Sequence, residues 1–86
     1  MADYHLGEIE SIFADIIWSN APLTSRLLAE LAEQRLRWKR TTTYTVLKRL
    51  CDRGLFQNQG GTVTALVSRE EFYARQSEQY VQDAFQ

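Results

Sequence analysis

The alternation of hydrophobic and polar residues predicts four helices and one pair of strands along this chain of 86 residues. Residues 38–55, WKRTTTYTVLKRLCDRGL, form the segment around which the rest is organised. At 100° per residue, one side of this predicted helix carries Thr43, Val46, Leu47 and Leu50. The other side carries Thr42, Thr45, Lys48, Arg49 and Asp52. The first face predicts packing on a core, and the second has no apolar residue that would explain it as buried.

Two amphipathic helices are predicted before this segment, over residues 7–18 and from Thr24 to about residue 33. Their apolar stripes consist of Leu6, Ile9, Phe13, Ile16 and Ile17 in the first, and Leu27, Leu28 and Leu31 in the second. Trp18 falls off the first stripe, so we expect it to pack where the helix frays. Thr24 is the predicted N-cap of the second helix, with Leu23 and Leu28 at the spacing of a hydrophobic staple.

The connector to the central helix covers residues 34–39, and we expect Trp38 within it to anchor the turn on the core. The alternative is that Trp38 stands on the surface as a DNA contact. The central helix is predicted to start between residues 39 and 41, with three successive threonines as possible N-caps: Thr41, Thr42 and Thr43. Gly54 is expected to end this helix.

After Gly54 the spacing of the hydrophobic residues changes from the helical period of about 3.6 residues to the strand period of 2. Residues 55–59 and 62–67 are β-prone and flank Gly60 and Gly61, which predicts a hairpin. Ser68 and Glu71 then form a capping box, so a last helix is predicted from residue 69 to near the C-terminus. Its apolar residues are Phe72, Tyr73, Tyr80, Val81, Ala84 and Phe85. Too little chain remains to cover them, so we expect a second copy to do so.

This order of elements predicts a mainly α fold with a small β-hairpin: a winged helix-turn-helix domain over residues 1–67, followed by a C-terminal dimerisation helix over residues 68–86. An apolar fraction of 44% and a charged fraction of 24% are ordinary for one globular domain. No run approaches the roughly 18 apolar residues of a membrane span, and the N-terminus lacks the pattern of a signal peptide. We therefore expect a cytoplasmic protein without membrane contact.

The titratable residues argue against an enzyme. The chain has one histidine, His5, and one cysteine, Cys51, and no nucleophile-base spacing, phosphate-binding glycine loop or metal-ligand cluster. We expect no catalytic site, no metal and no cofactor. Cys51 is expected to be a half-buried small hydrophobic residue.

The formal net charge of -1 hides an uneven distribution. Seven of the ten basic residues lie between positions 35 and 53, opposed there only by Asp52: Arg35, Arg37, Lys39, Arg40, Lys48, Arg49 and Arg53. A local basic patch can supply phosphate affinity even when the total charge is near zero. The patch coincides with the polar face of the central helix.

These residue types suit the major groove of double-stranded DNA. We expect Lys39, Arg40, Lys48 and Arg53 to hold phosphates, and Thr42, Thr45 and Arg49 to contact base edges. The alternative is a winged-helix module for protein–protein interaction, which near-neutral charge would suit. Against it, the polar face lacks the aromatic anchor that a protein interface would use.

The chain also resembles the penicillinase repressor family of bacterial transcriptional repressors over nearly its whole length. The resemblance rests on LGEIESIFADIIW, on WKRTTTYTVLKRLCDRGLF and on LVSREEF after a glycine wing. It implies a homodimeric repressor whose two recognition helices bind a palindromic operator, with Thr41, Thr42, Thr45 and Arg49 at the DNA-reading positions.

Three features of this chain differ from that family. Relatives extend through further C-terminal helices, which leaves open a truncated dimerisation arm or an unusually short relative. The basic residue often found at the wing is replaced by Gly60, Gly61 and Thr62, so we expect a weak phosphate contact there or one made by the backbone. The cysteine-rich C-terminal motif of the copper-responsive relatives is missing, so we do not expect copper sensing.

Overall fold

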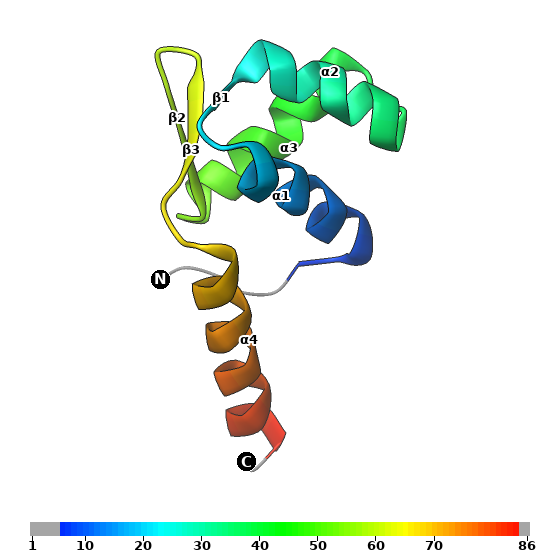
Figure 1. Ribbon diagram of the computed structural model, residues 1–86. Coiled ribbons are helices and arrows are strands. Elements are labelled where there is room, and N and C mark those ends of the chain that lie inside the picture. The colour runs from blue at the N-terminus through cyan, green and yellow to red at the C-terminus, as the bar shows by residue number, and fades with distance from the viewer. Residues whose placement is uncertain (1–5, 85–86) are drawn as a thin grey trace.

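The computed structural model describes residues 6–84, and their side chains from 6 to 76. The elements in chain order are α1 (Glu8–Asn20), β1 (Leu23–Thr24), α2 (Ser25–Leu36), α3 (Arg40–Asp52), β2 (Phe56–Gln59), β3 (Thr62–Ala65) and α4 (Arg69–Ala84). Helices α1, α2 and α3 pack together, a three-stranded antiparallel sheet in the order β1-β3-β2 lies beside them, and α4 leads away from this body (Figure 1). The predicted winged helix-turn-helix architecture is confirmed.

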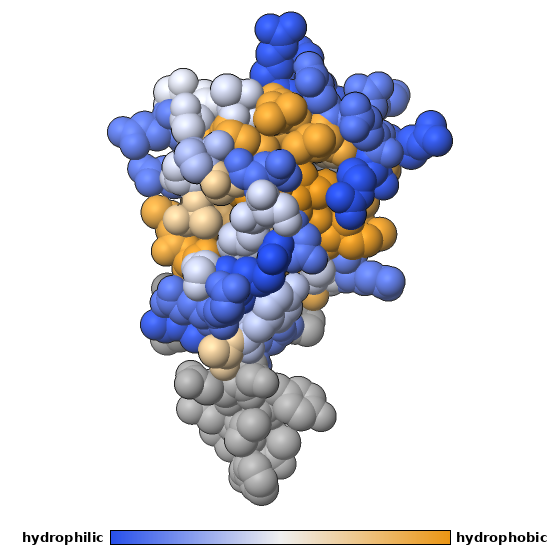
Figure 2. Space-filling view, in the orientation of Figure 1, coloured by the Kyte–Doolittle hydropathy of each residue, from blue (hydrophilic) through white to orange (hydrophobic). Residues whose placement is uncertain are grey.

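Helix α1 turns most of its predicted stripe into the core. Phe13, Ile16 and Ile17 are at most 3% exposed, but Ile9 is 52% exposed, so its prediction as a core residue was wrong. Helical periodicity gives the direction in which a side chain points, and it does not tell whether another element covers that position. Ile9 lies in the first turn of α1, and Figure 2 shows apolar surface over the α1 and α2 side of the body.

Helix α2 begins as predicted, because Thr24 is its N-cap and the Thr24 Oγ1 accepts a hydrogen bond from the Leu27 N–H at 3.0 Å. Of the predicted stripe, Leu28 is buried and Leu31 packs partly buried against the core, so only Leu27 lies off the buried face. Leu28, Ala29 and Ala32 are buried, whereas Leu27 is 41% exposed. Two of the three buried residues are alanines, which contribute little to a stripe of large hydrophobic residues.

The turn between α2 and α3 is shorter than predicted, since α2 continues to Leu36 and leaves only residues 37–39. Arg37 closes α2 in the left-handed region at φ 58°. The Trp38 ring lies 5.0 Å from the ring of Phe13, which confirms that Trp38 anchors the turn on the core. The N-cap of α3 is Lys39, so the expectation that a threonine caps it was wrong.

The wing is the predicted hairpin. Gly60 and Gly61 form a two-residue turn with φ of 59° and 85°, the positive values that a type I′ turn requires at both positions. The sequence did not reveal β1, a strand of two residues that pairs Leu23 with Val63. The Ser25 N–H also donates to the Gly61 carbonyl at 2.8 Å, so the tip of the wing is tied to the start of α2.

Trp18 joins α1 to the wing and to α4. We had expected the helix to fray at Trp18, but it continues to Asn20. The indole ring lies 5.4 Å from the rings of both Phe56 and Phe72, and its Nε1 donates to the Val67 carbonyl at 2.9 Å. A partly buried tryptophan that packs on the core and also satisfies a backbone carbonyl holds these elements together at one point.

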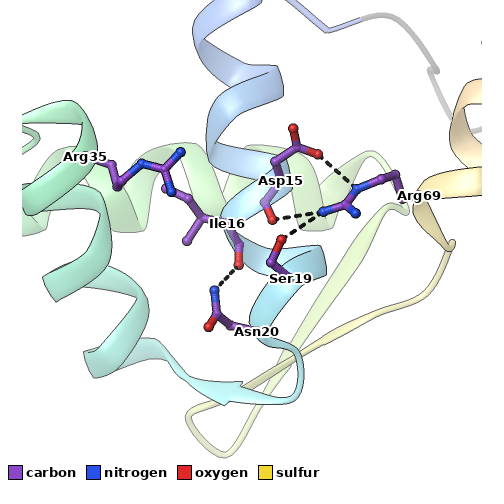
Figure 3. A pocket seen from close by; sticks show the side chains of 6 residues that line it. All are labelled: Asp15, Ile16, Ser19, Asn20, Arg35 and Arg69. Carbon is purple, nitrogen blue, oxygen red and sulfur yellow. Dashed lines mark hydrogen bonds and ion pairs between the residues drawn. The ribbon is translucent and has the colours of Figure 1, made fainter.

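Arg69, the first residue of α4, attaches that helix to α1 (Figure 3). Its Nε donates to Asp15 Oδ1 at 3.1 Å, and its Nη2 donates to Ser19 Oγ at 2.9 Å and to the Asp15 carbonyl at 3.4 Å. The Ser68 Oγ accepts from the Glu71 N–H at 3.0 Å, which confirms the predicted N-cap of α4. These bonds fix the direction in which α4 leaves the body.

The predicted dimerisation residues divide into three groups. Phe72 is fully buried in the core of the single chain, so its assignment to a dimer surface was wrong. Tyr73 is 40% exposed. Tyr80, Val81 and Ala84 belong to α4 but their side chains are not described, and Phe85 lies outside the described residues, as does His5.

The different positions of Phe72 and Tyr73 predict different effects on stability. Phe72→Ala should lower the free energy of unfolding by about 3–5 kcal/mol, because it leaves a cavity in the core beside Trp18. Tyr73→Ala should cost at most about 1 kcal/mol, because much of that ring is already in water. Urea unfolding followed by circular dichroism, at one protein concentration, measures both. Equal losses would contradict the placement of Phe72 in the core.

Candidate nucleic-acid interface

Helix α3 is oriented by its apolar face. Thr43, Val46, Leu47 and Leu50 are all at most 8% exposed, as the sequence predicted. Thr43 is polar but satisfied, because its hydroxyl donates to the Lys39 carbonyl at 3.3 Å. The opposite face of α3 is therefore turned to solvent.

Seven of the eight predicted DNA-binding residues are exposed on α3 and at its N-cap: Lys39, Arg40, Thr41, Thr42, Thr45, Lys48 and Arg49. The eighth, Arg53, lies at the C-cap and its side chain is only 21% exposed. The residues that the sequence placed on one face are thus brought together, and Arg53 lies at the edge of the set, against α1.

The hydroxyl of Thr45 is already used within the helix. Thr45 Oγ1 donates to the Thr41 carbonyl at 2.9 Å. In this state Thr45 offers an incoming base its methyl group and the lone pairs of its oxygen. That combination suits a thymine methyl or a base amino group.

The N-terminus of α3 adds a favourable field for anions. Lys39, the N-cap, makes no side-chain capping bond, and Arg40 is the first helical residue. The N–H groups of a helix's first turn and its macrodipole attract phosphate. Two cations stand at the same place, so charge and backbone act together there.

Sequence reasoning missed a carboxylate beside α3. Glu10 Oε2, from α1, lies 3.5 Å from Arg49 Nη1 and 3.8 Å from Arg53 Nη1. The sequence had indicated Asp52 as the only acidic residue opposing the basic patch. The only signal for Glu10 was its position in the first turn of α1, which indicates a helix cap and says nothing about a helix that begins 30 residues later.

The wing supplies no charged side chain, since residues 56–65 are FQNQGGTVTA. Gln57, Asn58 and Gln59 are exposed, and a Cβ built on Gly60 or Gly61 meets no other atom within 4 Å. The tip is open and polar, so any phosphate contact from it is made by amides, hydroxyls or backbone.

A shallow hollow of about 350 Å³ lies on the flank of α3 toward the wing, lined by Tyr44, Leu47, Lys48, Cys51 and Asn58. Cys51 is half-buried there, as expected. Burial raises the pKa of the Cys51 thiol, the nearby Asp52 charge raises it further, and a backbone hydrogen bond from Asn58 opposes the shift. A thiol with a raised pKa is mostly protonated at neutral pH and is a poor nucleophile.

The described residues contain neither a metal-binding cluster nor a membrane-spanning helix. No three His, Cys, Asp or Glu side chains among them lie close enough to hold a metal ion. No helix in the described part of the chain is both long and apolar enough to cross a membrane.

Comparison with known protein families gave a match. The model of a protein family described as penicillinase repressor matches residues 6–86, nearly the whole chain. No curated protein and no solved structure gave a significant match.

The raised pKa of Cys51 predicts a pH-dependent stability. The pKa of the Cys51 thiol in the folded chain lies above its value in the unfolded chain, which is about 8.5. The protonated thiol therefore contributes to the free energy of unfolding. This contribution is fully present below a pH of about 8.5 and is lost as the pH rises through the folded-state pKa. Wild type should therefore lose stability relative to Cys51→Ala as the pH rises above about 8.5. Urea unfolding at several pH values measures this difference, and a constant difference between the two proteins would contradict it.

Proposed function

This chain belongs to the penicillinase repressor family of DNA-binding transcriptional repressors, and from this premise we propose that it binds an inverted-repeat operator as a homodimer. Helix α3 of each copy enters a major groove. Lys39, Arg40 and Lys48 hold phosphates, while Thr42, Thr45 and Arg49 contact base edges. The family regulates transcription, and no enzymatic step is part of this proposal.

The observation that carries the proposal is the division of α3 into a buried apolar face and an exposed face of hydroxyls and cations. Leu47 and Leu50 are at most 2% exposed, while the adjacent Lys48 and Arg49 are exposed. A helix with small polar groups flanked by cations fits the major groove, where Arg and Thr can contact base edges and Lys can neutralise phosphate. The uncapped N-terminus of α3 adds anion affinity at one end.

Docking of a protein through α3 is the rival function, and one observation favours it. Tyr44 is 38% exposed beside the hollow that Leu47 and Cys51 line. Tyrosine is common at the centres of protein interfaces. Tyr44 lies at the flank of α3, however, and its neighbour one helical turn on is Lys48, so the exposed face as a whole is cationic and matches DNA better.

DNA binding itself is tested by selecting from random duplexes and measuring affinity by fluorescence anisotropy at two salt concentrations. The proposal expects an inverted repeat among the selected duplexes, with half-site centres about 10–10.5 base pairs apart or a multiple of that spacing. It also expects affinity to fall steeply with salt. Weak binding without sequence preference at either salt concentration would favour the protein-docking rival.

The separate roles of Arg49 and Lys48 give a matched pair of variants. Arg49→Ala should cost about 1–3 kcal/mol on the selected operator and relax the preference at one base position. Lys48→Ala should weaken binding to all duplexes alike and reduce the salt slope by about 1. Anisotropy titrations on the operator and on a scrambled duplex measure both. Equal losses from the two variants on both duplexes would contradict this division of roles.

We propose that two copies of the chain dimerise through α4. The sequence spacing of Tyr73, Tyr80, Val81 and Ala84 assigns them to one helical face. Val81→Asp places a charge on that face and should convert a dimer of twice 10.0 kDa into a monomer. Gln79→Asp adds the same charge about 100° from Tyr80 and about 160° from Val81 on the helix, and should leave the dimer intact. Light scattering after size exclusion gives the masses. A wild-type monomer, or a Val81→Asp dimer, would refute this part of the proposal.

A further inference from the structure

Glu10 bridges the start of α1 and the C-terminal half of α3. Its Oε1 accepts a hydrogen bond from the Gly7 N–H at 3.4 Å, which caps α1. Its Oε2 has almost no accessible surface and finds no hydrogen-bond donor among the described residues. The nearest charges to this oxygen are the two guanidinium groups of Arg49 and Arg53, at 3.5 and 3.8 Å. The carboxylate is thus held by the helix cap on one side and faces two cations on the other.

The two arginines differ in exposure. The Arg49 side chain is 58% exposed, whereas those of Arg53 and Glu10 are 21% and 24% exposed. Glu10 faces only one terminal nitrogen of Arg49, and a guanidinium has five N–H donors. The remaining N–H donors of Arg49 can therefore make a bidentate pair of hydrogen bonds to a base while Nη1 stays beside Glu10. Arg53 keeps the carboxylate partnered by a second cation throughout, so no buried charge is left bare.

We propose that Glu10 is a positioning residue for DNA reading: it orients the Arg49 fork toward a guanine edge and lowers the attraction of the same arginine for phosphate. This inference rests on the proposed operator binding by α3. An arginine held in advance loses less side-chain entropy when it makes its two hydrogen bonds to guanine. The negative charge beside it disfavours phosphate contacts, which occur on every sequence. Both effects raise the ratio of operator affinity to non-operator affinity.

The test uses Glu10→Gln in the full chain, with the operator found by selection and a scrambled duplex of the same composition as probes. Glutamine keeps an oxygen for the Gly7 N–H, as in natural capping boxes, and removes the charge. We expect affinity for the scrambled duplex to rise by up to about fivefold, the size of an exposed ion pair. The operator-to-scrambled ratio should fall by about twofold to tenfold, with the loss at the base position that Arg49→Ala relaxes.

Glu8→Gln is the matched control. Glu8 is exposed in the same first turn of α1, and this variant changes the net charge by the same amount. It should raise both affinities by one common factor and leave their ratio unchanged. Adding Glu10→Gln to Arg49→Ala should produce no further loss of ratio, because Glu10 acts through Arg49. Thermal unfolding of each variant, followed by circular dichroism, verifies that it is folded at the temperature of the titrations.

Glu10→Asp separates orientation from charge. It keeps the carboxylate but shortens the side chain by one methylene, so it should lower the operator preference while affinity for the scrambled duplex stays at the wild-type value. An unchanged ratio in both Glu10 variants would overturn the inference and leave operator binding intact, provided that Arg49→Ala still lowers the ratio. A wild-type chain without any sequence preference would instead overturn the proposed function, and this inference with it.

Discussion

The burial of one face of α3 is the constraint on which the rest of this structure depends. Leu47 and Leu50 lie in the core with Thr43 and Val46, and that contact sets the rotation of the helix about its axis. A rotation by one residue, about 100°, would turn Lys48 into the core, which burial of an unpaired charge forbids. The exposure of the polar face therefore follows from hydrophobic packing on the other side.

The second constraint is the junction at Trp18 and Arg69, where α1, the wing and α4 meet. Trp18 contacts rings from β2 and α4, and Arg69 makes three hydrogen bonds to the C-terminal half of α1. The base of α4 is thereby part of the core that supports α3. In the proposed dimer, such a junction makes the distance between the two α3 helices a property of the folded chain, and that distance sets the half-site spacing.

The exposed face of α3 combines basic residues, which attract phosphate, with one nearby carboxylate, which weakens that attraction. The basic residues at its N-terminus and along its exposed face lie in a chain whose net charge is only -1. Glu10 places a carboxylate within 4 Å of Arg49 and Arg53, so part of the basic patch is neutralised from within. In the proposed complex with DNA, this carboxylate would reduce the affinity of the patch for phosphate alone. In the proposed repressor, a larger share of the binding energy then depends on base contacts.

Sequence alone determined the helix order, the buried and exposed faces of α3, the Thr24 and Ser68 caps and the glycine turn of the wing. Each of these is a local property, expressed as a period, a cap or a turn within a few residues. Tertiary structure alone decided that Ile9 is exposed, that Phe72 belongs to the core, and that β1 pairs with the wing. It also brought Glu10 to Arg49, 39 positions away in the chain. Such contacts depend on which elements cover one another, and a periodic pattern carries no information about its partner.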